Sequence, residues 1–227
     1  MYLFYHDLIF LVLITVSYPI IVSRRRIDQI IKKHGLVSNY TIKQFKVKKS
    51  VVNNDIVDNI VSRMFKNRAI HEVMVSDLTY VRVLDKWCYI CLIVDVGSRE
   101  FVGYAARRHK DASFVLKVFA SIKQPLDNIK IFHTDRGSEF KNKLIEDLLD
   151  TFNIERSLSH KGCPYGNAVA EAAFKVIKAE FAFNRVFKSL EELERELFDY
   201  VKWYNTIRIH CSLNFLTPTE YRLQNCP

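Results

Sequence analysis

Residues 72–95, EVMVSDLTYVRVLDKWCYICLIVD, open the part of the chain that decides the fold. Two stretches rich in β-branched and aromatic side chains, 72–83 and 87–95, flank a short polar turn. A third such stretch covers 100–106, after a second turn. Apolar segments joined by tight turns predict an antiparallel meander of three strands.

Beyond this meander the pattern alternates between helical and extended segments. Helices are expected over 111–122, 138–152, 167–183 and 189–204, and short strands over 129–132 and 154–158. Ser189, followed by Glu192, forms a capping box at the start of the last helix. The large aromatic residues Trp87, Phe132, Phe174 and Trp203 are expected in the core. Three antiparallel strands followed by βα units predict a mixed α/β sheet with helices on its faces.

The composition is that of a folded basic protein. The 227 residues carry 34 Lys and Arg against 25 Asp and Glu, a net charge of +9, and 49% are apolar, which excludes wholesale disorder. Six Gly and five Pro exclude a collagen-like or low-complexity chain. Five Cys, an odd number, do not make a disulfide scaffold and indicate a reduced, cytoplasmic protein.

The positive charge lies in one arm, residues 23–69, which holds twelve basic and three acidic residues. Within it, residues 23–35 predict a short basic helix ending at Gly35, followed by a linker with a small helix around 55–66. Such an arm is typical of a nucleic-acid-binding protein. The alternatives are a solvated linker and a segment that binds anionic lipid.

The first 22 residues are unlike the rest. Residues 8–22 form an apolar run of 15, shorter than the roughly 20 residues that a spanning helix needs. A signal anchor is one interpretation, and a relic of a displaced start site or reading frame is the other. We therefore divide the chain into an atypical segment (1–22), a basic arm and linker (23–69) and a catalytic core with C-terminal helices (70–227).

Three acidic residues occupy unusual positions. Asp77 lies inside the first predicted strand, Asp135 at the end of the fourth, and Glu171 inside a helix among small and apolar residues. Each alone could be a cap, a turn residue or a solvated charge. Together they would meet at the carboxyl edge of the sheet, where α/β proteins place their sites. Clustered carboxylates need a cation to stay ionised, and oxygen ligands favour Mg²⁺ or Mn²⁺. The pattern indicates metal-dependent phosphoryl transfer on DNA.

The motifs around these carboxylates carry a family resemblance. SDLTY (76–80), IFHTDRGSEF (131–140) and GCPYGNAVAEAAFKVIKAE (162–180) resemble the catalytic core of bacterial insertion-sequence transposases of the second-frame (OrfB) type, which is similar to that of retroviral integrases. As in the family signature, 35 residues separate Asp135 from Glu171, and the basic Lys178 follows seven positions later.

The resemblance implies an RNase H-like mixed five-stranded sheet and a DDE-type enzyme that cleaves DNA strands and transfers them. It implies that Asp77, Asp135 and Glu171 are catalytic and hold two Mg²⁺ ions, with Mn²⁺ as a substitute. The expected partners are DNA, further copies of the chain and an upstream first-frame helix-turn-helix protein, in a nucleoid-associated location. The expected DNA contacts are basic or polar residues of the arm, loop and helix: Arg24, Arg25, Arg26, Lys32, Lys33, Lys161, Asn167 and Lys178.

The chain departs from the family pattern in three places. Gly166 stands where the family usually has Asp, the helical region before Ser23 is largely missing, and the chain has no helix-turn-helix of its own. These departures favour a truncated or frame-disrupted copy over a membrane protein. They leave two functions open, an active catalytic subunit and an inactive DNA-binding relic. Cys88 and Cys91 lie on a predicted strand on opposite faces, so zinc binding is not expected.

Overall fold

The computed structural model describes residues 23–35, 68–159, 168–182 and 185–226. The chain divides into two compact units, residues 1–49 and 50–227. Segment 1–22, the helix expected around 55–66 and the loop expected over 159–166, apart from Ser159, lie outside the described residues. No helix within the described ranges is both long and apolar enough to cross a membrane.

The first unit contains the predicted basic helix, α2 (Arg24–Lys33). Its N-cap is Ser23, whose side chain accepts a hydrogen bond from the amide of Arg26. Gly35 follows the helix with a φ of 61°, a left-handed conformation that glycine adopts without strain. The expected helix over 23–35 is confirmed.

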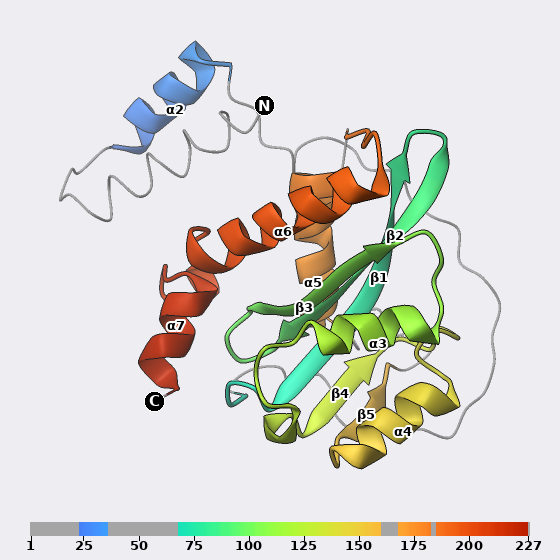
Figure 1. The fold of residues 1–227 in the computed structure, drawn as a ribbon. Coiled ribbons are helices and arrows are strands. Elements are labelled where there is room, and N and C mark those ends of the chain that lie inside the picture. Colours follow the sequence, from blue (N-terminus) through green and yellow to red (C-terminus); the bar gives the residue numbers. More distant parts are fainter. Residues whose placement is uncertain (1–22, 36–67, 160–167, 183–184, 227) are drawn as a thin grey trace. The chain divides into compact units, whose positions relative to one another are not determined.

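The second unit is built on a five-stranded sheet (Figure 1). Its strands are β1 (Val73–Val83), β2 (Lys86–Asp95), β3 (Phe101–Arg107), β4 (Ile131–Thr134) and β5 (Glu155–Leu158). The strand order is β3-β2-β1-β4-β5. The first three strands pair antiparallel, and β4 is parallel to both β1 and β5. This is the RNase H-like arrangement expected from the sequence.

Helices cover both faces of this sheet. They are α3 (Ala112–Ala120), α4 (Lys143–Thr151), α5 (Ala168–Ile177), α6 (Leu190–Thr206) and α7 (Pro218–Asn225), with short 3₁₀ turns at Leu126–Asn128 and Cys211–Leu213. One core cluster joins α5 and α6 to the sheet through residues such as Val75, Ile177 and Leu197. The other joins α3 and α4 to the opposite face through residues such as Phe114 and Leu149.

Local chemistry shifts two of the predicted boundaries. The helix expected over 138–152 begins at Lys143, because the Asn142 side chain accepts a hydrogen bond from the Ile145 amide and caps it there. The helix expected over 167–183 changes at Lys178 into a π-helical turn, Lys178–Ala182. Such turns occur often at functional sites. Ser189 caps α6 as expected, accepting from the Glu192 amide.

One expected core residue is not in the core. Phe132 and Phe174 are buried and Trp203 packs against the first cluster, but Trp87 is 55% exposed. Trp87 lies near the tip of the β1–β2 hairpin, where the strands extend past α3 and α4 (Figure 1). Cys88 and Cys91 belong to different core clusters and so face opposite sides of β2.

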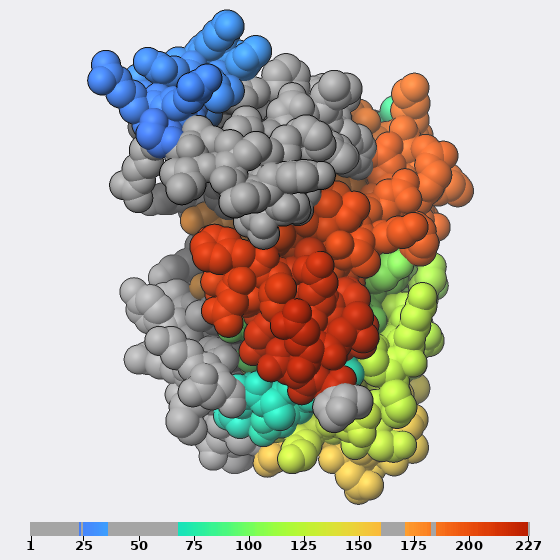
Figure 2. Space-filling model, turned by 90° about the vertical axis from the view of Figure 1, so that its left-hand side faces the viewer, coloured from blue at the N-terminus to red at the C-terminus, as the bar shows by residue number. Residues whose placement is uncertain are grey.

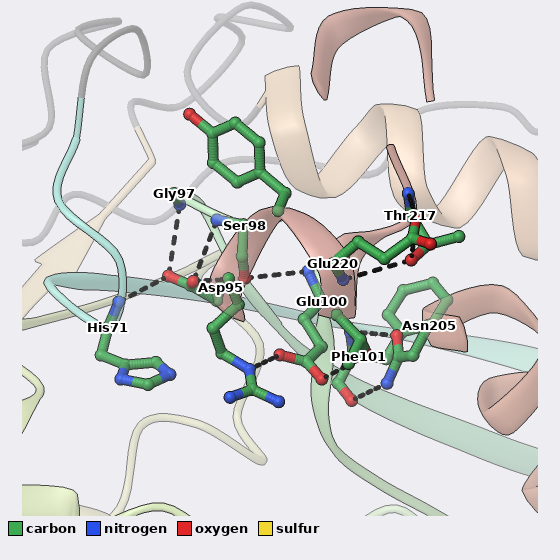
Figure 3. A network of polar contacts seen from close by, with 12 residues as sticks. His71, Asp95, Gly97, Ser98, Glu100, Phe101, Asn205, Thr217 and Glu220 are labelled. Carbon is green, nitrogen blue, oxygen red and sulfur yellow. Dashed lines mark hydrogen bonds and ion pairs between the residues drawn. The ribbon is translucent and has the colours of Figure 1, made fainter. Parts of the chain in front are cut away.

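A polar network ties the C-terminal helices to the turn between β2 and β3 (Figure 3). The buried Asp95 carboxylate accepts hydrogen bonds from the amides of His71, Gly97 and Ser98. Next to it, the buried Glu100 carboxylate accepts from Arg222 at 2.7 Å. Asn205 of α6 both donates to and accepts from the backbone of Phe101, at 3.0 Å in each case.

The same region is visible in Figure 2. The red surface of the C-terminal segment lies beside the cyan residues near the start of β1. Residues beyond 200 are therefore an integral part of the second unit rather than a separate tail.

Candidate active site

Asp77 and Asp135 lie on neighbouring parallel strands at the same edge of the sheet. The β1–β4 pairing runs from Val73 and Ile131 to Val75 and His133. Each aspartate is two residues beyond the last of these pairs, so the two lie at the same level. This is the carboxyl edge of β4, where the sequence placed the site.

Asp77 is half-buried within β1, and its Oδ1 accepts a hydrogen bond of 2.7 Å from the Leu78 amide. Burial raises the pKa of the Asp77 carboxyl to about 7, and the negative charges of Asp135 and Glu139 act in the same direction. The Leu78 amide and the positive charge of Lys178 oppose this rise. A substantial fraction of Asp77 is therefore protonated near neutral pH.

Asp135 directly follows β4 and opens a turn. Its Oδ1 accepts a hydrogen bond of 2.9 Å from the Gly137 amide. Burial and the charge of Glu139 raise the pKa of the Asp135 carboxyl, against the opposing effects of the Gly137 amide and Lys110. Each aspartate is thus harder to ionise than a solvated carboxyl group, and the two are coupled.

Glu139 is a further carboxylate of this site that the sequence analysis missed. Its side chain is only 7% exposed and forms an ion pair with Lys110 at 3.7 Å. A Cβ atom at Gly137 would lie 2.8 Å from the Glu139 carboxyl group, so the end of the Glu139 side chain lies directly against this turn. The sequence signal that could have identified Glu139 was its position in IFHTDRGSEF, directly before Phe140, which is buried.

Glu171 and Lys178 come from the helix packed on β1. Glu171 is exposed on α5, and burial raises the pKa of its carboxyl. Lys178, at the start of the π-helical turn, acts electrostatically on Asp77 and so belongs to the site. Within the described ranges, no group of three or more His, Cys, Asp or Glu side chains is arranged to hold a metal ion. The structure thus brings Asp77, Asp135, Glu139 and Lys178 close to one another. It does not bring Glu171 into a group that could hold a metal ion.

The other expected DNA contacts fall either outside the described residues or in the first unit. Lys161 and Asn167, together with Gly166, lie outside the described residues. Arg24, Arg25, Arg26, Lys32 and Lys33 all belong to α2 in the first unit. Of these, Lys32 pairs with Asp28 at 2.8 Å, and both side chains remain mostly exposed.

The raised pKa of Asp77 predicts a pH-dependent stability. The carboxyl has a pKa of about 7 in the folded chain and 3.8 ordinarily, so folding becomes less favourable as pH rises between these values. Asp77→Asn removes this penalty. In the absence of metal, we expect it to raise the unfolding midpoint by about 2–8 °C at about pH 8, from roughly 1–2 kcal/mol after solvent screening. At about pH 5 the gain should be much smaller.

The measurement is thermal unfolding followed by circular dichroism at both pH values. Asp150→Asn, an exposed change on α4, is the matched control and should show no such pH-dependent gain. An equal effect of Asp77→Asn at both pH values would contradict the assignment.

Comparison with known proteins agrees with this geometry. Residues 67–164 and 171–226 match two family models that are both described as Integrase core domain, and together these span more than half of the chain. The chain is 28% identical over 212 residues to the transposase for insertion sequence element IS904 of Lactococcus lactis subsp. lactis, covering 91% of this chain and 83% of that one.

A second relative and a solved structure show partial coverage. The putative transposase InsK for insertion sequence element IS150 of Escherichia coli is 28% identical over 168 residues, which is 73% of this chain and 59% of InsK. The HTLV-2 integrase catalytic core in complex with magnesium aligns with a TM-score of 0.48 at 14% identity, over 66% of this chain and 95% of that one. On the family matches, the chain belongs to the integrase core domain family, and it is similar to insertion-sequence transposases.

Proposed function

We propose that this chain is the catalytic subunit of an insertion-sequence transposase, a DDE-type polynucleotidyl transferase. In this reaction water breaks a phosphodiester at an element end and frees a 3′-hydroxyl group. That hydroxyl then attacks a phosphodiester of the target DNA, and the broken strand leaves. The observation that carries the proposal is the pair Asp77 and Asp135 at one sheet edge, with the pKa of Asp77 raised to about 7.

The donor set fits divalent metal ions. Two coupled carboxyl groups that resist ionisation are stabilised in their charged forms by a cation, and their hard oxygen atoms suit Mg²⁺ or Mn²⁺. We assign Asp77, Asp135 and Glu171 as the residues that would hold two such ions. When bound, the ions would polarise the attacking oxygen and neutralise charge on the leaving oxygen. Glu171 comes from α5, which packs on β1, and cation binding would remove the repulsion that opposes its approach.

The chain's own residues would position the DNA. The positive charge of Lys178 acts on the Asp77 carboxyl, and the Lys178 side chain is exposed. This position suits a contact between Lys178 and a phosphate near the reacting bond. The Gly137 amide holds the Asp135 carboxylate in place. In this proposal Lys161, Asn167 and the basic residues of α2 also contact DNA.

The proposal includes the assembly and its location. Joining two element ends to a target requires at least two active sites in register, so we propose that several copies assemble on DNA, at the nucleoid. A first-frame helix-turn-helix protein would supply recognition of the ends.

Metal-dependent nicking of a supercoiled plasmid tests the proposed function. We expect open-circle product with Mn²⁺ or Mg²⁺ and none with a chelator, because without a cation the carboxylates cannot assemble around the reacting phosphate. The same samples should retard DNA in a gel with or without metal. Nicking that persists in the chelator would contradict the proposal.

The alternative function is a catalytically inactive DNA-binding relic. The observation in its favour is that the described residues contain no assembled group of three metal-binding side chains. Salt-sensitive DNA binding without nicking would support the relic. Gly166→Asp restores the family residue in the loop before α5, and recovery of nicking by this change would place the defect there rather than in the sheet.

A further inference from the structure

The β1–β2 hairpin extends well past the candidate active site. β1 pairs with β4 only as far as Val75, but with β2 as far as Val83. Tyr80 is three residues beyond Asp77, which is about 10 Å along the strand. In Figure 1 the hairpin tip rises above the end of β4, beyond α3 and α4. Asp77 pairs with Leu92 of the first core cluster, so the side chains of Asp77 and Tyr80 point to opposite faces of the sheet.

One face of the extension carries aromatic and cationic side chains. Because residues that pair across antiparallel strands share a face, the pairs Tyr80–Tyr89, Arg82–Trp87 and Tyr89–Arg107 lie on the same side. We call these five residues the hairpin platform.

The platform is open to solvent where it is most aromatic. Tyr80 is 51% exposed and Trp87 is 55% exposed. Their rings meet edge to face, with centroids 5.1 Å apart, and the Arg82 guanidinium lies 6.0 Å from the centre of the Trp87 ring. Further down the same face, Cys91 and Ile93 are buried in the cluster under α3 and α4. The aromatic rings are thus left exposed because the strands outrun the helices.

The charge of the platform favours a polyanion. The Arg82 side chain is exposed and its Nε donates to the Leu84 carbonyl oxygen at 3.0 Å, and no described carboxylate pairs with it. Arg107 pairs with Asp111 at 3.4 Å, and Arg108, His109 and Lys110 follow it at the same edge. Pairing two copies of this face about a two-fold axis would bring arginines together, so a second copy of the chain is disfavoured.

We propose that the hairpin platform binds unpaired nucleotides of the substrate DNA outside the catalytic centre, on the sheet face opposite the Asp77 side chain, with bases stacked on Trp87 and Tyr80 and phosphates near Arg82. Exposed aromatic rings in a positive field are the general means of holding single-stranded DNA without reading its sequence. This inference rests on the proposed transposase function, because it names where that substrate lies.

The fluorescence of Trp87 provides a direct test. The chain has two Trp, so Trp203→Phe leaves Trp87 as the single reporter. Combining this change with Asp135→Asn keeps the readout independent of catalysis. Titration with a thymidine oligonucleotide should quench Trp87 strongly, whereas inorganic polyphosphate, which has no bases, should not. Binding of the oligonucleotide without quenching would overturn the proposal.

A second measurement uses the chain with both tryptophans. Trp87→Ala should weaken binding of the labelled oligonucleotide about ten-fold in fluorescence anisotropy, with an unchanged unfolding midpoint. Phe198→Ala, which removes a 50% exposed aromatic ring from α6, is the matched control and should leave the affinity unchanged.

The outcomes separate this inference from the proposed function. Quenching in a chain that fails to nick plasmid would support the platform and count against catalysis. Trp87→Ala could instead change the sedimentation coefficient of the chain and leave its affinity for the oligonucleotide unchanged. That result would overturn the proposal and identify the platform as a protein interface.

Discussion

Asp135→Asn is expected to reduce plasmid nicking about a thousand-fold or more, because in the proposed function Asp135 would supply a charged oxygen ligand to the ion that stabilises the transition state. Asn keeps the size of the side chain and can still accept the Gly137 hydrogen bond of 2.9 Å, so the turn after β4 should keep its conformation. The measurement is the initial rate of open-circle formation with saturating Mn²⁺. The affinity of the variant for DNA, measured by gel shift, should equal that of the unaltered chain.

Asp150→Asn on α4 is the control for this experiment, since it removes the same charge from an exposed position away from β4. It should nick at the rate of the unaltered chain. If Asp135→Asn nicked equally well, the observed nicking would come from another source and the carboxylate assignment would fail.

Arg208→Ala is expected to give the largest loss of stability. Arg208 donates from Nη2 and Nε to the Glu180 carboxylate, at 2.8 Å to Oε1 and 3.1 Å to Oε2. The Glu180 side chain is only 2% exposed, and Tyr200 also donates to it at 3.1 Å. Removing the guanidinium takes a charged hydrogen-bond partner away from this buried carboxylate, at a cost of about 3–5 kcal/mol. For a chain of this size the unfolding midpoint should fall by roughly 6–20 °C.

This ion pair also has a functional position. Glu180 lies in the π-helical turn that begins at Lys178, so Arg208 anchors the helix that presents Lys178 to Asp77. Lys117→Ala is the matched control, because it breaks the exposed pair with Glu194 at 3.1 Å and should cost less than about 1 kcal/mol. The double variant Glu180→Met with Arg208→Met should recover most of the lost stability, since it leaves no unpaired charge. Equal midpoints for Arg208→Ala and Lys117→Ala would contradict a buried role for this pair.

Asp77 and Asp135 show how much of the site a local sequence pattern can predict. Alternating apolar residues predicted β1, and a short apolar run predicted β4, although two residues early. Parallel strands that are neighbours end at one edge, so Asp77 and Asp135 could be placed together without coordinates. The spacing from Asp135 to Glu171 and Lys178 identified the family, which the comparisons confirm. The roles of these residues remain a prediction.

The sequence by itself thus determined the order of strands and helices along the chain, the mixed sheet with helices on its faces and the edge where two carboxylates meet, because these depend on hydrophobic period and chain connectivity. Only the tertiary structure decided which residues beyond the motif join the site. Glu139 faces the aspartates because the turn at Gly137 folds its side chain back against the end of β4. Trp87 is exposed because β1 and β2 extend past α3 and α4, the helices that cover its face of the sheet. Period-two alternation tells which face a side chain takes, but how far a neighbouring element covers that face depends on packing between distant segments.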